Sequence, residues 1–355
     1  NFKVFFRKTE IAIIYLVIGI SVFILSIDLA YNLTFYWDVQ KLWFPKTLNF
    51  FYDGSIADLK ETSYPHYSFL GSLIWAFFWK LSFMNSEYFG RIIYIFIFCF
   101  SIFNFISLSK LSLVKKILIF ILLIFLIYDY WHFRGTQEIL IFSFLLISSK
   151  YLFKIIFEKK YNIEYLFIFF LSTNLILWTK NEGIILSMCL NLTLIFFINK
   201  DYKFRFLILF IYLILVGLRF GIFKLYGLDL NLSKDFNFNS LILSMINNFS
   251  IQNVFYIIKY IIISILKFPH ILLSLIFAIL ITFDKSLFKK SLFIYFYLLL
   301  SISFVFVIYL STSKDVMFMV STGSLRIMFE LSAPYLLFVI LLLENNSTKY
   351  KIINN

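Results

Sequence analysis

The sequence predicts an all-α, polytopic membrane protein with about ten transmembrane helices and additional juxtamembrane helices in its first outer loop. The composition supports this class: 62% of the residues are hydrophobic, 14% are charged and the mean hydropathy is +0.91. A soluble domain carries about 25% charged residues. Apolar runs of about 17 to 25 residues, the length that crosses a bilayer, recur along the chain. We therefore expect one membrane domain over residues 1–355.

Charge and cysteine content exclude several other classes. The net charge of +13 does not indicate a nucleic-acid partner, because basic residues of membrane proteins collect in cytoplasmic loops and set orientation. Cys99 and Cys189 both lie within apolar runs, so we expect neither a disulfide framework nor a metal site built on cysteine. The sequence has no glycine-rich phosphate loop and no recognisable Ser/His/Asp order.

The first apolar run, 11–30, follows the basic residues Lys3, Arg7 and Lys8, as the apolar part of a signal peptide does. It lacks a cleavage site of small residues, and we expect it to be a retained first helix.

Hydropathy marks twelve apolar segments, which are 11–30, 68–83, 91–109, 117–128, 139–156, 165–179, 184–198, 206–223, 251–266, 270–283, 291–310 and 326–343. If all twelve crossed the membrane, several strongly basic loops would lie outside, against the positive-inside rule. We expect 68–83 and 251–266 not to cross. Each follows a long polar loop and contains a cation, Lys80 or Lys259, which suits an interfacial or re-entrant helix.

Ten crossings remain, with both termini in the cytoplasm. The cytoplasmic loops then hold almost all of the net charge of +13. The predicted outer segments are 31–90, 129–138, 180–183, 224–269 and 311–325. Ionisable groups near membrane depth are costly, so the acids and cations on this side indicate function.

The first outer loop begins with an acid. Asp38 follows Trp37, and the apolar spacing through Phe44 predicts a short amphipathic helix at the interface. A carboxylate there can be partly desolvated, which suits a general base or a metal ligand. An ordinary loop acid beside an aromatic belt is the alternative.

The same loop ends in a proline-bearing motif. Tyr64, Pro65 and His66 precede segment 68–83, and Pro65 suits the start of a helix. His66 would lie at the outer surface, where a structural histidine is the alternative to a substrate-binding one. Arg91 opens the next crossing and could hold a phosphate or act as an interfacial anchor.

The second outer loop, Tyr128 to Glu138, is the densest functional candidate, with aromatic residues, a histidine, Arg134 and two acids. Glu138 stands at the start of a helix, where a carboxylate also complements the helix dipole. That capping role is the alternative to a catalytic one.

Two further outer positions carry charge. Lys180 and Glu182 lie in a tight turn between two helices, where they could bind substrate or simply pair with each other. Arg326 precedes Glu330 and Pro334 and could hold a phosphate or act as a snorkelling anchor.

Taken in order, these motifs resemble the GT-C superfamily of membrane glycosyltransferases, most closely its protein O-mannosyltransferase and aminoarabinose transferase branch. The motifs that carry the resemblance are Asp38, Tyr64-Pro65-His66-Tyr67, Phe69 to Phe78, Glu87 to Arg91, Lys115-Lys116 and Arg134 to Glu138. They cover an N-terminal module of residues 1–200 with its outer loop 31–90. Residues 201–355 add further transmembrane helices, and the likeness there is confined to Arg326 through Pro334.

The resemblance implies a glycosyltransferase of the bacterial inner membrane that moves a sugar from a polyprenyl-phosphate donor, on the outer face. The acceptor would be a glycan, a lipid or a protein. Asp38 would be the general base and Glu138 would position the acceptor or share a divalent ion, Mg²⁺ or Mn²⁺, with Asp38. Substrate contacts would come from Tyr64, His66, Arg91, Arg134, Lys180, Glu182 and Arg326.

The alternative is a non-enzymatic transporter or flippase of lipid-linked sugars or other amphiphiles, in which the same outer charges form a binding site. A transporter is expected to have helices broken by Gly or Pro near the middle of the membrane, and only 10 Gly and 4 Pro occur here.

Overall fold

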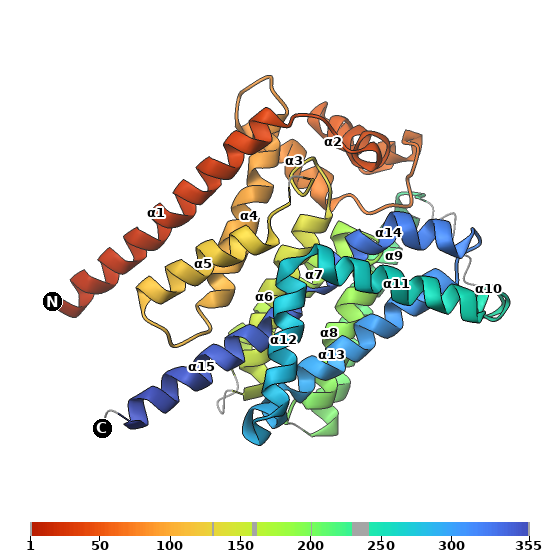
Figure 1. Cartoon of the computed structure of the whole chain (residues 1–355). Coiled ribbons are helices and arrows are strands. Elements are labelled where there is room, and N and C mark those ends of the chain that lie inside the picture. The colour runs from red at the N-terminus through yellow and green to blue at the C-terminus, as the bar shows by residue number, and fades with distance from the viewer. Residues whose placement is uncertain (1, 130, 158–161, 200, 229–240, 354–355) are drawn as a thin grey trace.

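The computed structural model describes residues 2–129, 131–157, 162–199, 201–228 and 241–353, and this part of the chain is a bundle of helices (Figure 1). The α-helices are α1 (Phe2–Tyr31), α2 (Phe44–Phe51), α3 (Leu70–Leu81), α4 (Tyr88–Ile106), α5 (Leu113–Ile127), α6 (Glu138–Phe157), α7 (Ile163–Thr179), α8 (Gly183–Phe197), α9 (Tyr202–Leu225), α10 (Leu241–Asn248), α11 (Ile251–Lys267), α12 (Pro269–Thr282), α13 (Lys285–Leu310), α14 (Val316–Leu331) and α15 (Leu336–Ile353). Shorter turns are η1 (Val39–Trp43), η2 (Ala57–Glu61) and η4 (Ala333–Tyr335).

Helix α6 lies at the centre of the bundle and packs against α4, α7, α8 and α14. Consecutive residues such as Leu140, Ile141 and Phe142 are all fully buried, so the helix is covered on every side. A helix that is apolar all round is stable only when other helices or lipid surround it. Its position brings its first residue, Glu138, to one end of the core.

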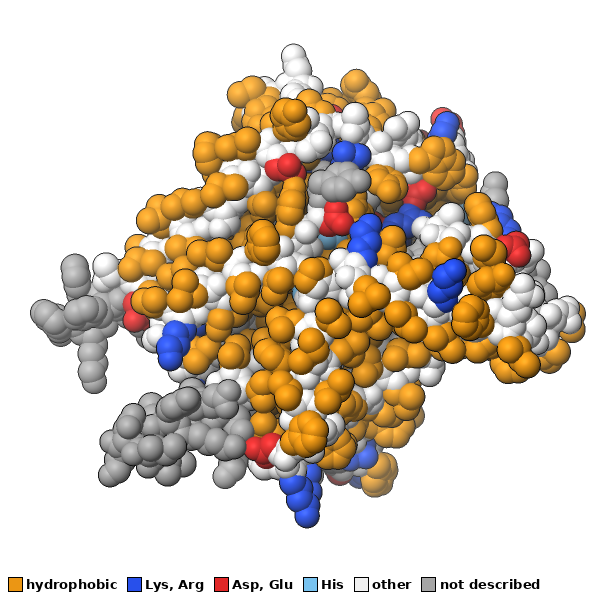
Figure 2. Space-filling model, viewed as in Figure 1, with side chains coloured by type: hydrophobic (Ala, Val, Ile, Leu, Met, Phe, Trp, Pro, Cys, Tyr) orange, Lys and Arg blue, Asp and Glu red, His pale blue; other side chains and the backbone are white. Residues whose placement is uncertain are grey.

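Large apolar side chains cover much of the surface, as the orange atoms in Figure 2 show. The clearest case is α1, which packs mainly along α4 while only 6% of its apolar window is buried. Tyr15, Leu16 and Phe23 on this helix are more than 60% exposed. Such a surface is compatible with the hydrocarbon core of a bilayer, and the chain has the composition of a membrane protein.

Within the described residues, five helices are long and apolar enough to cross a membrane, namely α1, α4, α6, α9 and α13. Two bent pairs raise the number to seven: α10 with α11, bent by 95°, and α14 with Ala333–Glu344, bent by 42°. The expected count of about ten is not confirmed. Helix α12, for example, has 14 residues, which is about 21 Å at 1.5 Å per residue against a hydrocarbon core of about 30 Å.

The two segments expected not to cross form α3, of 12 residues, and α11, which turns sharply away from α10. Lys80 on α3 pairs with Asp53 at 2.5 Å, at the surface of the first loop. The amphipathic helix expected after Asp38 is present as the turn η1, which buries Val39, Leu42 and Trp43, followed by α2.

Two of the predicted outer loops, the first one and the loop that leads to α6, lie together at one end of the bundle, where Gly135 packs against Val39 and Trp75. In Figure 1, α2, α3 and α14 lie toward the upper right, while the start of α1 and the end of α15 lie toward the lower left. We call the end that carries α2, α3 and the start of α6 the outer end. The candidate site lies there.

Candidate functional site

Six charged side chains from distant parts of the chain meet at the outer end of the core. Asp38 precedes η1, Glu138 opens α6, a tight turn joins α7 to α8, and α14 carries the last two residues. The members of this ionic cluster are Asp38, Glu138, Lys180, Glu182, Arg326 and Glu330. The structure therefore brings together both predicted catalytic acids and three of the predicted substrate-binding residues.

Lys180 is the centre of the cluster. Its Nζ lies 2.8 Å from Glu330 Oε1, 3.2 Å from Glu138 Oε1 and 3.7 Å from Glu182 Oε1. Burial alone would lower the pKa of Lys180, but the attraction of the three carboxylates outweighs it and holds the pKa well above its ordinary value. Lys180 is therefore a buried cation surrounded by three carboxylates.

Arg326 joins the two predicted catalytic acids. Its Nη1 forms an ion pair with Asp38 Oδ2 and lies 3.9 Å from Glu138 Oε1. Arg326 and Glu330 are four residues apart on α14 and so share one face of that helix. Asp38 and Arg326 keep 21% and 32% of their side-chain surface exposed, whereas Glu330 is fully buried. The cluster thus has an accessible side at Asp38 and a closed side at Glu330.

A glycine lets the two acid-bearing loops approach. Gly135, three residues before Glu138, has φ +87°, and a Cβ there would lie 2.7 Å from Val39 Cγ1 and 2.9 Å from the Trp75 ring. Only glycine accepts both this backbone conformation and this contact. Because Val39 follows Asp38 directly, the close approach places Asp38 beside the start of α6.

Contacts at both ends of α14 fix its orientation. The Asp315 carboxylate caps the helix by accepting a hydrogen bond from the Phe318 amide at 2.7 Å. After the last turn, the Ser332 hydroxyl lies 2.8 Å from His270 Nε2, and the Phe329 ring stacks on His132 at 3.9 Å. These contacts direct Glu330 toward Lys180.

Acceptor atoms exceed donors in the cluster. It holds four carboxylates and two cations, and the Oε2 atoms of Glu138, Glu182 and Glu330 have no hydrogen-bond partner within the described residues. The hydroxyls of Tyr309 and Ser324, also buried, are unpartnered in the same part of the chain. Buried unpaired carboxylate oxygens are costly, so these atoms are suited to bind a ligand rich in hydrogen-bond donors.

Three further predicted substrate-binding residues lie in the outer loops that lead to the cluster: Tyr64, His66 and Arg134. The His66 side chain is buried, and its backbone carbonyl accepts a hydrogen bond from Asn181 Nδ2 at 3.2 Å. The Tyr64 ring packs edge-on against His66 with 6.0 Å between centroids. Arg134 is half-buried in the loop that leads to Glu138.

Arg91, predicted to hold a phosphate, has other partners. Its guanidinium binds Glu87 at 2.5 and 3.0 Å and donates to the carbonyls of Phe133 at 3.3 Å and Leu33 at 3.4 Å. These contacts use its donors to join α4 to two loops. In the described residues Arg91 is buried and joins α4 to two loops, and its predicted role in holding a phosphate stays a prediction.

Three buried residues near the cluster were not among the predicted site residues: Arg219, Asn181 and Lys46. An arginine within an apolar helix is a recognisable signal, and Arg219 on α9 is such a residue. Lys46 is fully buried and donates a hydrogen bond to the Tyr67 carbonyl. Burial and the nearby charge of Arg219 lower the pKa of Lys46 to about 7.

The residues do not fit a divalent ion shared by Asp38 and Glu138. The guanidinium of Arg326 stands between these carboxylates. Within the described ranges, no three His, Cys, Asp or Glu side chains form a group that could hold a metal ion.

Comparison of the chain with protein-family models, curated proteins and solved structures finds no match.

Proposed function

We propose that the protein transfers a sugar from a polyprenyl-phosphate donor to an acceptor at the outer end of the bundle. The observation that carries this proposal is the meeting of Asp38 and Glu138 at Arg326, beside the buried cation Lys180. Carboxylates and cations at one end of an apolar bundle suit a substrate with a lipid tail and a polar, anionic head.

The donor would contact both the apolar surface of the bundle and the ionic cluster. Its polyprenyl chain would lie along the apolar surface of the bundle, and its phosphate would approach the accessible side of the cluster. Arg326 is the cation there, with about a third of its side chain exposed. When the phosphate binds Arg326, the Asp38 carboxylate loses its ion-pair partner and becomes able to accept a proton.

The transfer step then follows from these positions. The acceptor hydroxyl oxygen forms a bond to the anomeric carbon, and its proton passes to Asp38. The bond between the anomeric carbon and the phosphate oxygen breaks, and the electron pair leaves with polyprenyl phosphate. Arg326 and Lys180 stabilise the charge that grows on this leaving group.

The unpartnered carboxylate oxygens would orient the sugar. Hydroxyl groups are hydrogen-bond donors, and Glu138, Glu182 and Glu330 each offer an Oε2 atom without a partner in the described residues. Such bonds to charged acceptors are about twice as strong as neutral ones.

Purified protein in liposomes, supplied with a panel of radiolabelled polyprenyl-phosphate sugars and crude envelope acceptors, tests the proposal. We expect release of polyprenyl phosphate from at least one donor. Asp38→Asn should slow the reaction about 100-fold or more, as removal of a general base does. Asp53→Asn is the matched control: Asp53 lies in the same loop, is 90% exposed at its side chain, and should tolerate the change.

Full activity of Asp38→Asn would remove the proposed base. If the wild-type protein consumes none of the donors, the proposal that it is a glycosyltransferase is wrong.

A carrier of lipid-linked sugars is the second candidate, favoured by the bends of 95° and 42° in the two helix pairs α10–α11 and α14–α15. Broken helices next to charged groups are typical of transporters. A fluorescent lipid-linked sugar that moves between leaflets without losing its sugar would support the carrier.

A further inference from the structure

We propose that Arg219 is a positioning residue that holds Lys180 in the centre of the ionic cluster. The contacts of Arg219 stand independently of the reaction, whereas its effect on sugar transfer rests on the proposed function. Arg219 lies on α9, is 2% exposed and has no carboxylate ion pair within the described residues.

Arg219 binds the backbone where α7 ends. Its Nη1 donates to the Leu177 carbonyl at 2.5 Å and to the Lys180 carbonyl at 3.4 Å. The last carbonyls of a helix lack partners within that helix and carry partial negative charge. The guanidinium is the side-chain partner of the Leu177 carbonyl, and it adds a second, longer contact to the Lys180 carbonyl, which also accepts from the Gly183 amide at 3.1 Å.

The same guanidinium reaches the neighbouring residue of the turn. Its Nη2 donates to Asn181 Oδ1, which also accepts from the Ser68 hydroxyl at 3.3 Å. The Asn181 amide in turn donates to the His66 carbonyl at 3.2 Å. Arg219 therefore links α9, the α7–α8 turn and the first outer loop.

The geometry of Lys180 depends on this link. The backbone of Lys180 is held by Arg219 from one side, and its ammonium is placed among carboxylates from α6, α14 and its own turn. A second contact from α9, between the Tyr212 hydroxyl and the Ile184 carbonyl at 2.6 Å, secures the start of α8. Loss of the guanidinium removes the donor to the Leu177 carbonyl and to Asn181 Oδ1, on either side of Lys180, and the turn can then shift.

Arg205 provides a matched control. It lies on the same helix, and its Nη2 donates to the carbonyl of Ile198, the residue that follows α8, at 3.1 Å. Both arginines thus bind the end of a neighbouring helix, but the described contacts of Arg205 do not reach the ionic cluster.

The first experiment measures the reactivity of Lys180 toward an amine-selective reagent by mass spectrometry, in nanodiscs and without substrate. Wild-type Lys180 should react slowly, because it is buried and protonated. Arg219→Gln should raise its labelling several-fold, and Arg205→Gln should leave it unchanged. Lys150, buried in α6, reports on intact folding. If Arg219→Gln also exposes Lys150, Arg219→Lys replaces it, and we expect intermediate labelling of Lys180.

The second experiment uses sugar transfer. Arg219→Gln should lower the rate about 10-fold or more, and it should have no further effect in a Lys180→Gln background, because both changes remove the same placed cation. The proposal would be overturned if the double variant lost the product of the two single-variant losses in rate, or if Arg219→Gln left the labelling of Lys180 unchanged. Absence of transfer by the wild-type protein would count against the proposed function alone, since the labelling result needs no reaction.

Discussion

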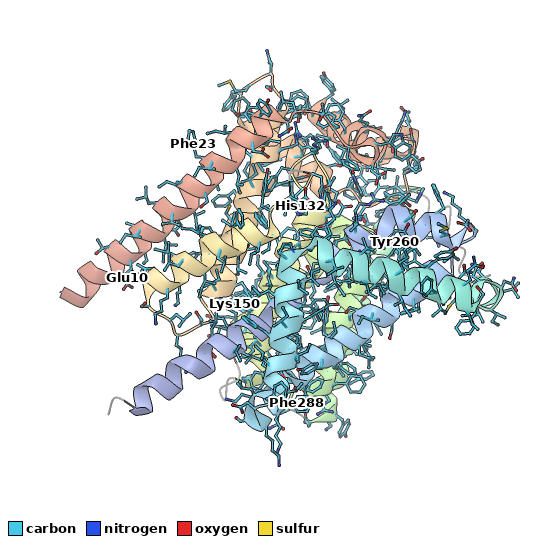
Figure 3. The ribbon with its side chains drawn as sticks, in the orientation of Figure 1. Glu10, Phe23, His132, Lys150, Tyr260 and Phe288 are labelled. Atoms are coloured by element: carbon cyan, nitrogen blue, oxygen red, sulfur yellow. The ribbon has the colours of Figure 1, made fainter. Side chains whose placement is uncertain are left out.

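Two buried lysines at different levels of the bundle show how differently one charge can be accommodated. Lys150 on α6 and Lys180 in the α7–α8 turn are 7% and 6% exposed. Lys150 donates to the Asn104 side chain at 2.5 Å and to the Ser107 hydroxyl at 2.8 Å, both uncharged, whereas Lys180 faces three carboxylates. Figure 3 shows Lys150 well below His132, whose ring stacks on Phe329 next to Glu330.

The two regions differ in the number of hydrogen-bond acceptor atoms that remain free to bind a ligand. The neutral oxygens around Lys150 are used in joining α4 to α6, which is a structural task. The carboxylates around Lys180 retain acceptor oxygens that no described residue satisfies. Burial of a charge is therefore weak evidence of chemistry, and an excess of unpaired acceptors beside it is stronger evidence.

Replacement of either lysine by glutamine should give the largest difference in the rate of sugar transfer. Lys180→Gln leaves the buried carboxylates without their central cation, and we expect the rate of sugar transfer to fall about 100-fold or more. Lys150→Gln keeps a hydrogen-bonding side chain and should stay within about 3-fold of wild type. Initial rates at saturating donor measure both. Similar losses for the two variants would abolish the distinction between the regions.

Two glutamates paired with cations offer the next test. Glu330→Gln keeps the size of the side chain but removes a charge beside Lys180, and we expect transfer to fall about 10-fold. Glu87→Gln removes the partner of Arg91, outside the cluster. It should lower the midpoint of thermal unfolding and leave transfer nearly unchanged. A normal rate for Glu330→Gln would exclude Glu330 from the site.

Lys46 extends the comparison to a third buried lysine. Its pKa is about 7 in the folded protein and near 10.5 when exposed, so between these values the unfolded chain binds more protons. The free energy of unfolding should therefore rise with pH, by at most about 1.4 kcal/mol per pH unit.

Denaturant unfolding in detergent between pH 7 and pH 9 measures how the free energy of unfolding changes with pH. Lys46→Met should remove the part of this change that comes from Lys46. An identical slope in the variant would show that Lys46 does not titrate in this range.

Low charge and long apolar runs predicted an all-helical membrane protein, because an apolar run of about 20 residues satisfies its own backbone hydrogen bonds in lipid as a helix, and the described residues are helical. The number of spans was not predictable in the same way. The apolar segment 326–343 contains Pro334, and the structure breaks it there into α14, η4 and α15. Hydropathy averages over such a break, although the proline itself was a visible signal.

The candidate site was partly predictable for a similar reason. The charge asymmetry placed Asp38, Glu138, Lys180 and Arg326 on one side, and the structure brings them together at one end of the bundle. The sequence offered Glu182 as a partner of Lys180, but the approach of Glu330 could not be derived, since it depends on how α14 packs against α6. The same applies to Arg219, whose acceptors are backbone carbonyls.

Gly135 has a mechanical consequence for access to the cluster. Because a Cβ at Gly135 would lie within 3 Å of Val39 Cγ1 and of the Trp75 ring, the lack of a side chain here lets the loop that leads to Glu138 pack closely against the segment that carries Asp38. Arg326 comes from a separate element, the helix α14, which ends shortly before the turn Ala333–Tyr335. A headgroup that binds Arg326 would therefore compete with both acids at once, because Asp38 and Glu138 contact the same guanidinium.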